Sequence, residues 1–233
     1  LAALLENRRL WRIGPARGVV QQVDEAAKRQ AALQFVTARH VGGRRRQAAA
    51  GEVISGALTT EGRPDLKNHR KIVALIYSAQ RRLSITSPYF VPDDSLLYAI
   101  TTAAQRGIDV ELFVGDEGDQ FMVHHAQRSY YEALLRAGVK IYLYPAPLVL
   151  HSKHLSVDDD VEVIGSSNMD IRSFNLDFEI SVMCVSQSLT TAMRQVEDQY
   201  RSLSRELALA EWRRRPIRKR YLDNVMRLTS ALQ

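Results

Sequence analysis

The chain has 233 residues, of which 45% are hydrophobic and 25% are charged, and this composition excludes disorder as its main state. Thirty-two basic residues against 26 acidic ones give a net charge of +6, which favours an anionic partner such as a lipid headgroup, a phosphodiester or a nucleic acid. The single cysteine, Cys184, excludes an intramolecular disulfide, and no apolar run approaches the roughly 20 residues of a membrane-spanning helix.

The first zone, residues 1–66, is rich in Ala, Arg and Gly and shows little periodic patterning. Residues 24–38 are compatible with a helix. Residues 42–46, Gly-Gly-Arg-Arg-Arg, form either a solvated loop or an anion-binding loop. No signal peptide is visible, and the chain begins with Leu1 in place of a methionine, as a fragment would.

The second zone, residues 67–210, alternates helical and strand patterns. The expected helices lie around 72–77, from a cap at Asp93 or Asp94 to Gly107, over 121–137 with Gly138 as C-cap, and over 189–209. The expected strands are 82–87, 110–114, 139–144, 151–157, 161–164 and 178–185. Strands that alternate with helices predict an α/β fold in which helices cover a mostly buried sheet.

The third zone, residues 211–233, is a basic tail. Six Arg or Lys side chains fall within residues 212–220. Apolar residues then recur at helical spacing, at Leu222, Val225, Met226 and Leu228. A basic helix with an apolar stripe and a tryptophan, Trp212, is typical of a segment that lies on a membrane surface. The alternative is a terminal helix that packs on the domain.

The stretch that begins at His151 is rich in chemistry-bearing residues. In a strand, residues two apart share a face, so we expect His151 and Lys153 to point the same way. A neutral imidazole is a nucleophile or a proton carrier near neutral pH, and a nearby lysine neutralises an oxyanion. Asp158 begins an acidic turn, and since a carboxylate would repel a phosphate, we expect it to hold structure or to pair with a base.

Residues 165–168, Gly-Ser-Ser-Asn, end a predicted strand with small hydrogen-bonding residues. Such a segment offers backbone N–H, hydroxyl and amide donors to an anion. Together with His151 and Lys153, these residues suit phosphoryl transfer through a covalent phosphohistidine, and this chemistry requires no metal and no other cofactor.

The same residues match a known signature. The chain resembles the phospholipase D superfamily, whose motif H-x-K-x4-D-x6-G-S-x-N is matched in full at His151, Lys153, Asp158, Gly165, Ser166 and Asn168. The flanking segments 87–92, 128–132, 168–175 and 211–216 resemble the second half of bacterial cardiolipin synthases, actinobacterial ones in particular. The resemblance covers roughly residues 63–233 and implies a phospholipase D-like fold, a mixed sheet flanked by helices, with one complete repeat.

The resemblance also implies a role for each residue. His151 would be the nucleophile or the proton donor, Lys153, Ser166 and Asn168 would bind the phosphate, and the carboxylate of Glu179 would fix the histidine tautomer. The implied reaction transfers a phosphatidyl group from one phosphatidylglycerol to the glycerol of another and releases glycerol. The implied partner is anionic phospholipid, and the implied location is the periphery of the cytoplasmic membrane.

The chain departs from the family in its first motif. Cardiolipin synthases carry two such motifs, and each supplies one histidine to a shared site. Here His69 and Lys71 resemble an opening, but Ile76 stands where the acid belongs and no G-S-x-N follows. Either a remnant of the first motif is fused to the second repeat, or His69 and Lys71 are ordinary polar residues on a helix. A homodimer would bring two copies of His151 together.

Three functions stay open: a phosphatidyltransferase, a single-motif dimeric phosphodiesterase or endonuclease, and an inactive remnant that binds anionic membrane. Nucleic acid is a less favoured partner than phospholipid. A metal site at His151-x-x-His154 explains the residues less well than the phosphodiesterase motif does. Residues 158–160 lack the twelve-residue pattern of a calcium loop.

Overall fold

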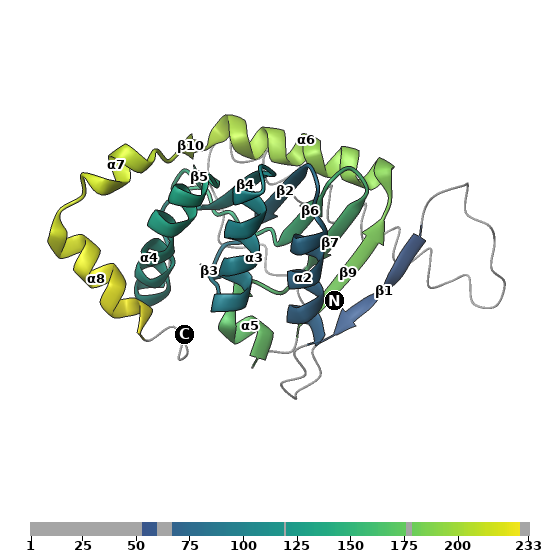
Figure 1. The fold of residues 1–233 in the computed structure, drawn as a ribbon, viewed down its shortest axis with the longest axis horizontal. Helices are drawn as coiled ribbons and strands as arrows, with labels where there is room; N and C mark the ends of the chain where they lie inside the picture. Colours follow the sequence, from purple (N-terminus) through teal and green to yellow (C-terminus); the bar gives the residue numbers. More distant parts are fainter. Residues whose placement is uncertain (1–52, 60–66, 119, 176–178, 229–233) are drawn as a thin grey trace, which may run out of the picture. The chain divides into compact units, whose positions relative to one another are not determined.

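The computed structural model describes residues 53–59, 67–118, 120–175 and 179–228 (Figure 1). These residues belong to one compact unit, Gln47–Gln233. The expected helix over 24–38 and the basic loop at 42–46 lie outside the described residues. In the described part of the chain, no helix combines the length and the apolar character needed to cross a bilayer.

A mixed sheet forms the centre of this unit. In the described residues its strands are arranged in the order β1 (Val53–Thr59), β9 (Ile180–Val185), β7 (Val161–Gly165), β6 (His154–Val157), β2 (Arg82–Thr86), β4 (Asp109–Gly115), β5 (Lys140–Tyr144) and β10 (Arg205–Glu206). The pairs β2–β4 and β4–β5 are parallel, and the other pairs are antiparallel. A separate ribbon pairs β3 (Phe90–Val91) with β8 (Met169–Asp170).

Helices cover both faces of the sheet (Figure 1). One face carries α2 (Lys67–Ser78), α3 (Asp94–Gln105) and α4 (Phe121–Ala137), and the other carries α6 (Gln187–Leu203). The short α5 (Ile171–Asn175) and the terminal helices α7 (Leu209–Arg213) and α8 (Ile217–Arg227) complete the described part. This arrangement confirms the predicted α/β fold with a mixed sheet flanked by helices.

The helix limits follow the residues that were expected to set them. Asp93 is the N-cap of α3 and accepts a hydrogen bond from the backbone N–H of Leu96 at 2.9 Å. Helix α4 has the predicted bounds, and Gly138 ends it in the left-handed conformation with φ 98°. Local signals were therefore sufficient for these two helices.

Two predicted boundaries were clearly wrong, and one long strand was missed. The strand expected from residue 151 begins at His154, so the segment 151–153 precedes the sheet. The helix expected to reach residue 209 ends at Leu203, because Arg205 and Glu206 pair with β5 instead. Strand β1 was not predicted at all, and it pairs antiparallel with β9.

The basic tail is attached to the fold. Trp212 is 4% exposed and packs against Tyr131, with ring centroids 5.1 Å apart, so it is not available as a membrane anchor. The guanidinium of Arg215 lies 3.2 Å from the Trp212 ring centroid and also pairs with Asp223 at 2.7 Å. Helix α8 packs along α4, as the alternative interpretation of a terminal helix requires (Figure 1).

Candidate active site

Both halves of the motif lie at one edge of the sheet. The strand register sets Thr86, the last residue of β2, opposite His154, the first residue of β6. It also sets Gly165, the last residue of β7, opposite Ser181 in β9. The backbone N–H of Gly165 donates to the carbonyl oxygen of Lys153 at 3.1 Å. The segments 151–153 and 165–168 are therefore joined directly, although they are distant in sequence.

His151 and Lys153 contact each other outside regular secondary structure. Lys153 Nζ lies 3.4 Å from His151 Nδ1 and donates to the carbonyl oxygen of His151 at 3.0 Å. His151 is exposed and Lys153 is partly buried. The two residues were expected to share a face of a strand, but no strand includes them. The structure nevertheless brings the two side chains together. An ammonium beside an exposed imidazole makes a site that attracts anions.

Ser166 and Glu179 meet beside this segment. The hydroxyl of Ser166 donates to the Glu179 carboxylate and accepts from the backbone N–H of Ile180 at 3.0 Å. The backbones approach so closely here that a Cβ at Gly165 would lie 2.5 Å from the carbonyl oxygen of Ile180. Glycine is therefore required at Gly165, and it lets Ser166 reach Glu179.

Asn168 faces a small pocket between the β3–β8 ribbon and the start of α4. Its Nδ2 lies 3.4 Å from the hydroxyl of Ser173, while its buried Oδ1 has no hydrogen-bond partner among the described residues. The pocket has a volume of about 220 Å³ and is lined by Tyr89, Val91, Gln120, Val123, Asn168, Asp170, Arg172 and Ser173. A buried amide oxygen of this kind can accept a hydrogen bond from a hydroxyl or an amine of a ligand.

Asp158 is at the other end of β6 from His151. Its carboxylate accepts backbone N–H donors of Gln80, Arg81 and Arg82 at 2.8–3.2 Å, and its own backbone is left-handed with φ 50°. Partial burial acts to raise the pKa of Asp158, but these three donors outweigh it and hold that pKa below its ordinary value. Asp158 therefore holds local structure, which is one of the two roles expected from the sequence.

His154 is buried beneath α6. From the sequence, the only role considered for it was that of a metal ligand. Its Nδ1 lies 3.2 Å from the hydroxyl of Ser152, and its Nε2 lies 3.1 Å from the hydroxyl of Thr86 and 3.6 Å from the carboxylate of Glu197. In the described part of the chain, no group of three or more His, Cys, Asp or Glu side chains could hold a metal ion. The contacts of His154 anchor the segment that carries Lys153.

Two buried carboxylates continue this polar layer. The hydroxyl of Ser156 lies 3.0 Å from Glu162 and 2.6 Å from Glu197, and both acids are fully buried. Burial, followed by repulsion from Glu197, raises the pKa of Glu162 well above its ordinary value. Burial also acts to raise the pKa of Glu197, but its contacts with His154 and Ser156 lower that pKa below the ordinary value. Of the two acids, Glu162 therefore keeps its proton to the higher pH.

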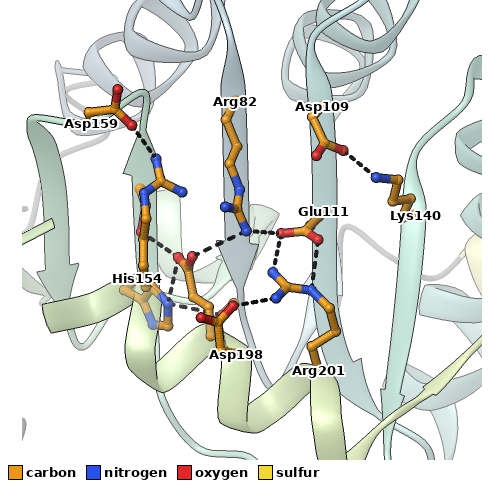
Figure 2. A network of polar contacts seen from close by, with 12 residues as sticks. Arg82, Asp109, Glu111, Lys140, His154, Asp159, Asp198 and Arg201 are labelled. Carbon is orange, nitrogen blue, oxygen red and sulfur yellow. Dashed lines mark hydrogen bonds and ion pairs between the residues drawn. The ribbon is translucent and has the colours of Figure 1, made fainter. Parts of the chain in front are cut away.

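Arginines complete the layer. Figure 2 shows Arg82 and Arg201 converging on Glu111, with Arg82 Nη2 and Arg201 Nη2 each 2.7 Å from its carboxylate. Arg201 comes from α6, and the other two residues come from neighbouring strands. This ion cluster ties the helix to the sheet. In the sequence, only the alternation of polar and apolar residues along β2 and β4 indicated this ion cluster.

His69 and Lys71 occupy helix α2. His69 is 7% exposed, with its Nε2 3.0 Å from Asp93 Oδ1 and its ring centroid 5.0 Å from that of Phe174, while Lys71 is exposed. Ile76, which stands where the acid of a first motif belongs, is fully buried in the core. His69 and Lys71 therefore lie on a helix, and no acid stands at position 76.

Comparison with known proteins gives a consistent result. A family model described as "Cardiolipin synthase, PLD-like domain" matches residues 72–203. Proteins named cardiolipin synthase A from Yersinia pseudotuberculosis (serotype O:1b) and Yersinia pestis (bv. Antiqua) are each 38% identical to the chain over 182 residues, or 78% of its length. The match covers 37% of each of these relatives, so the chain spans little more than a third of their length.

Solved structures with the same fold are more distant in sequence. Phosphatidylserine synthase from Haemophilus influenzae superposes with a TM-score of 0.64 at 19% identity and covers 76% of this chain and 47% of its own. The phospholipase D family member Nuc from Salmonella typhimurium superposes with a TM-score of 0.57 at 17% identity, over 67% of this chain and 99% of its own. At these identities the similarity concerns the fold alone.

Proposed function

The chain belongs to the cardiolipin synthase family with a phospholipase D-like domain, and from this membership we propose that it is a phosphatidyltransferase. In the proposed reaction, one phosphatidylglycerol gives its phosphatidyl group to the glycerol of a second, so that cardiolipin and glycerol form. The observation that carries the proposal is the contact of His151 with Lys153 beside Ser166 and Glu179, at one sheet edge.

Each residue has a defined part in the proposed mechanism. An imidazole nitrogen bonds to phosphorus while the bond from phosphorus to the glycerol oxygen breaks, and a general acid protonates that oxygen. The acceptor hydroxyl then loses its proton to a base, its oxygen bonds to phosphorus, and the N–P bond breaks. His151 is the nucleophile or the acid, and the cation of Lys153 stabilises the phosphate oxygens.

The remaining site residues support these steps. Ser166 and the amide of Asn168 donate to the phosphate, and Glu179 orients the histidine ring and keeps its reacting nitrogen available. The proposal assigns Ser166 two roles in sequence, since its hydroxyl hydrogen bonds to Glu179 before substrate is bound. Asp158 maintains the far end of β6 through its three backbone donors.

The proposed chemistry needs a second histidine and a lipid substrate. We assign the second histidine to another copy of the motif, most simply His151 of a second chain in a symmetric homodimer. The proposed partner is anionic phospholipid, and the proposed location is the surface of the cytoplasmic membrane, where such lipid resides. Among the described residues His69 does not serve, because it is buried against Asp93 and Phe174.

A second candidate is a dimeric phosphodiesterase or endonuclease. It is favoured by the single complete motif in this chain and by the net charge of +6. Both candidates would use the same histidine, and they differ in the phosphodiester that is cleaved and in the acceptor, which is a glycerol hydroxyl in the first and water in the second.

Parallel assays on two substrates test the proposal. The purified chain is incubated with phosphatidylglycerol vesicles and, separately, with plasmid DNA, with Lys153→Met as the matched variant in both. We expect cardiolipin and glycerol in equal amounts from the wild type and a loss of at least about 100-fold in the variant. DNA cleavage without cardiolipin would replace the first candidate with the second.

A further inference from the structure

Helix α8 has two apolar faces, and the fold uses only one of them. The inner face packs on α4 and includes half-buried Leu222 and Met226. On the same face, the carboxylate of buried Asp223 lies 2.7 Å from His125 Nδ1. The outer face presents Ile217, Tyr221 and Leu228, which are 81%, 71% and 84% exposed.

The outer residues form a continuous stripe. Positions 217, 221, 224 and 228 are four, three and four residues apart, which aligns them along one side of an α-helix. Three of the four carry large apolar side chains, and Asn224 is the fourth. Isolated exposed apolar residues are ordinary, but a helical stripe of three side chains that are all more than two-thirds exposed indicates an interaction surface.

Basic residues flank this stripe. Residues 212–228 contain seven Arg or Lys and one acid, Asp223, and that acid is buried between Arg215 and His125. Two of these basic residues border the stripe on the helix surface: Arg218 is exposed and forms no ion pair with the described residues, and Arg220 is exposed and pairs with Glu132 at 3.2 Å. An apolar stripe bordered by exposed basic residues complements an anionic lipid surface, in which the apolar side chains enter the hydrocarbon boundary and the cations meet phosphate groups.

The stripe is also close to the candidate active site. Helix α4 connects the two, since His125 contacts Asp223 of α8 and its ring is 4.5 Å from that of Phe121. Phe121 and Met122 at the start of α4 are themselves 62% and 44% exposed, and their neighbour Gln120 lines the pocket that contains Asn168. Figure 1 shows α8 lying along α4.

We propose that the outer face of α8, together with the first turn of α4, docks the protein on an anionic lipid surface and so holds the His151 edge close to phospholipid headgroups. The proposal rests on the proposed function only for the choice of phosphatidylglycerol as the anionic lipid. The buried Trp212 takes no part in it, and the exposed Tyr221 takes the position of an interfacial aromatic residue.

Vesicle cosedimentation tests this without any turnover. The whole chain is incubated with phosphatidylcholine vesicles that either contain or lack phosphatidylglycerol. We expect binding only to the anionic vesicles, and weaker binding at higher salt. The double variant Ile217→Ser/Tyr221→Ser should bind at least about tenfold more weakly. Tyr98→Ser, which removes a comparably exposed aromatic residue from α3, should bind like the wild type.

Two charge-reversal variants test the electrostatic part of the proposal. Arg218→Glu on α8 should weaken binding severalfold, while Arg70→Glu, the same change at an exposed position of α2, should have a clearly smaller effect. Equal binding by the double variant and the wild type would overturn the proposal. So would absence of wild-type binding, or a double variant that turns a dimer into monomers while vesicle binding is unchanged. A chain that binds vesicles but forms no cardiolipin would contradict the proposed function and leave the docking surface intact.

Discussion

The two faces of the central sheet are both buried, but they are built from different chemistry. Toward α2, α3 and α4 the strands present fully buried hydrocarbon, such as Leu83, Ile85 and Leu112. Toward α6 the same strands present Arg82 and Glu111, together with the polar and acidic residues that follow on β6 and β7. Alternation along each strand produces both faces at once, because successive side chains point to opposite sides of a sheet.

The apolar face stabilises the fold, and the polar face positions the motif segment. Hydrocarbon burial is the main source of stability, whereas a buried ion pair returns little beyond the cost of removing its charges from water. A polar layer does, however, penalise any arrangement that leaves one of its members unpaired. Since His154 belongs to this layer and directly follows Lys153, the layer fixes where the motif segment leaves the sheet.

The largest effect should follow from truncation on the apolar face. Leu112→Ala removes a fully buried side chain and leaves a cavity, and we expect it to lower the free energy of unfolding by about 2–5 kcal/mol. Urea denaturation measures this change. A loss below about 1 kcal/mol would mean that the apolar face is not the main source of stability.

A smaller loss is expected from the polar face. Glu111→Ala leaves Arg82 and Arg201 without their shared carboxylate, but both arginine side chains are about one quarter exposed and can recruit water. We expect a loss of about 1–3 kcal/mol in the same denaturation experiment. Asp198→Ala removes the exposed acid that also pairs with Arg201 and should cost less than about 1 kcal/mol. If this control cost as much as Glu111→Ala, burial of the cluster would not matter.

Two neighbouring aspartates at the end of β6 differ in their partners, because Asp158 binds backbone N–H groups and Asp159 pairs with arginine side chains. Asp158→Ala leaves three backbone N–H groups without their acceptor and should cost about 1–2 kcal/mol at neutral pH. Because the folded pKa of Asp158 is lowered, its contribution is fully present above the unfolded pKa and is lost as the pH falls through the folded value. Asp159→Ala breaks only half-exposed pairs with Arg81 and Arg194 and should cost less. Equal losses at neutral pH would contradict the role of Asp158.

The smallest expected changes are those of Tm at the two buried acids, and they should have opposite signs. The pKa of Glu162 is raised in the folded state, so this residue lowers the free energy of unfolding once the pH exceeds its unfolded pKa. We therefore expect Glu162→Gln to raise Tm by a few degrees at neutral pH. Glu197 has a lowered folded pKa, so Glu197→Gln should lower Tm at neutral pH, and this difference should shrink as the pH falls. Thermal unfolding at neutral and acidic pH checks both directions, and Tm shifts of the same sign would contradict the opposite pKa shifts of the two acids.

The elements that were predicted correctly have local causes. Residues 121–137 combine helical periodicity with a glycine stop, and Asp93 is a strong N-cap, so neither depends on distant chain. The errors have distant causes. Strand β1 exists through pairing with β9, and Arg205 leaves the helical pattern because β5 offers it backbone partners. No local signal reports such a partner.

The site follows the same rule. The spacing from His151 to Asn168 was readable from the sequence, since a phosphodiesterase motif has fixed intervals. The burial of His154 could not be predicted from the sequence. Its neighbouring strand, Arg82–Thr86, alternates polar and apolar residues, and such a strand normally exposes its polar side to water. Here α6 covers that side and supplies Glu197, more than 40 residues further along the chain.

One measurement separates the chemical histidine from the structural one. Cardiolipin and glycerol formation from phosphatidylglycerol vesicles is compared for the wild type, His151→Gln and His154→Gln, with Tm recorded for each. We predict that His151→Gln keeps the wild-type Tm and loses turnover by at least about 1,000-fold, while His154→Gln lowers Tm and retains measurable turnover below that temperature. Full turnover by His151→Gln, or none by a folded wild type, would contradict the assignment of this chain as a phosphatidyltransferase that acts through His151.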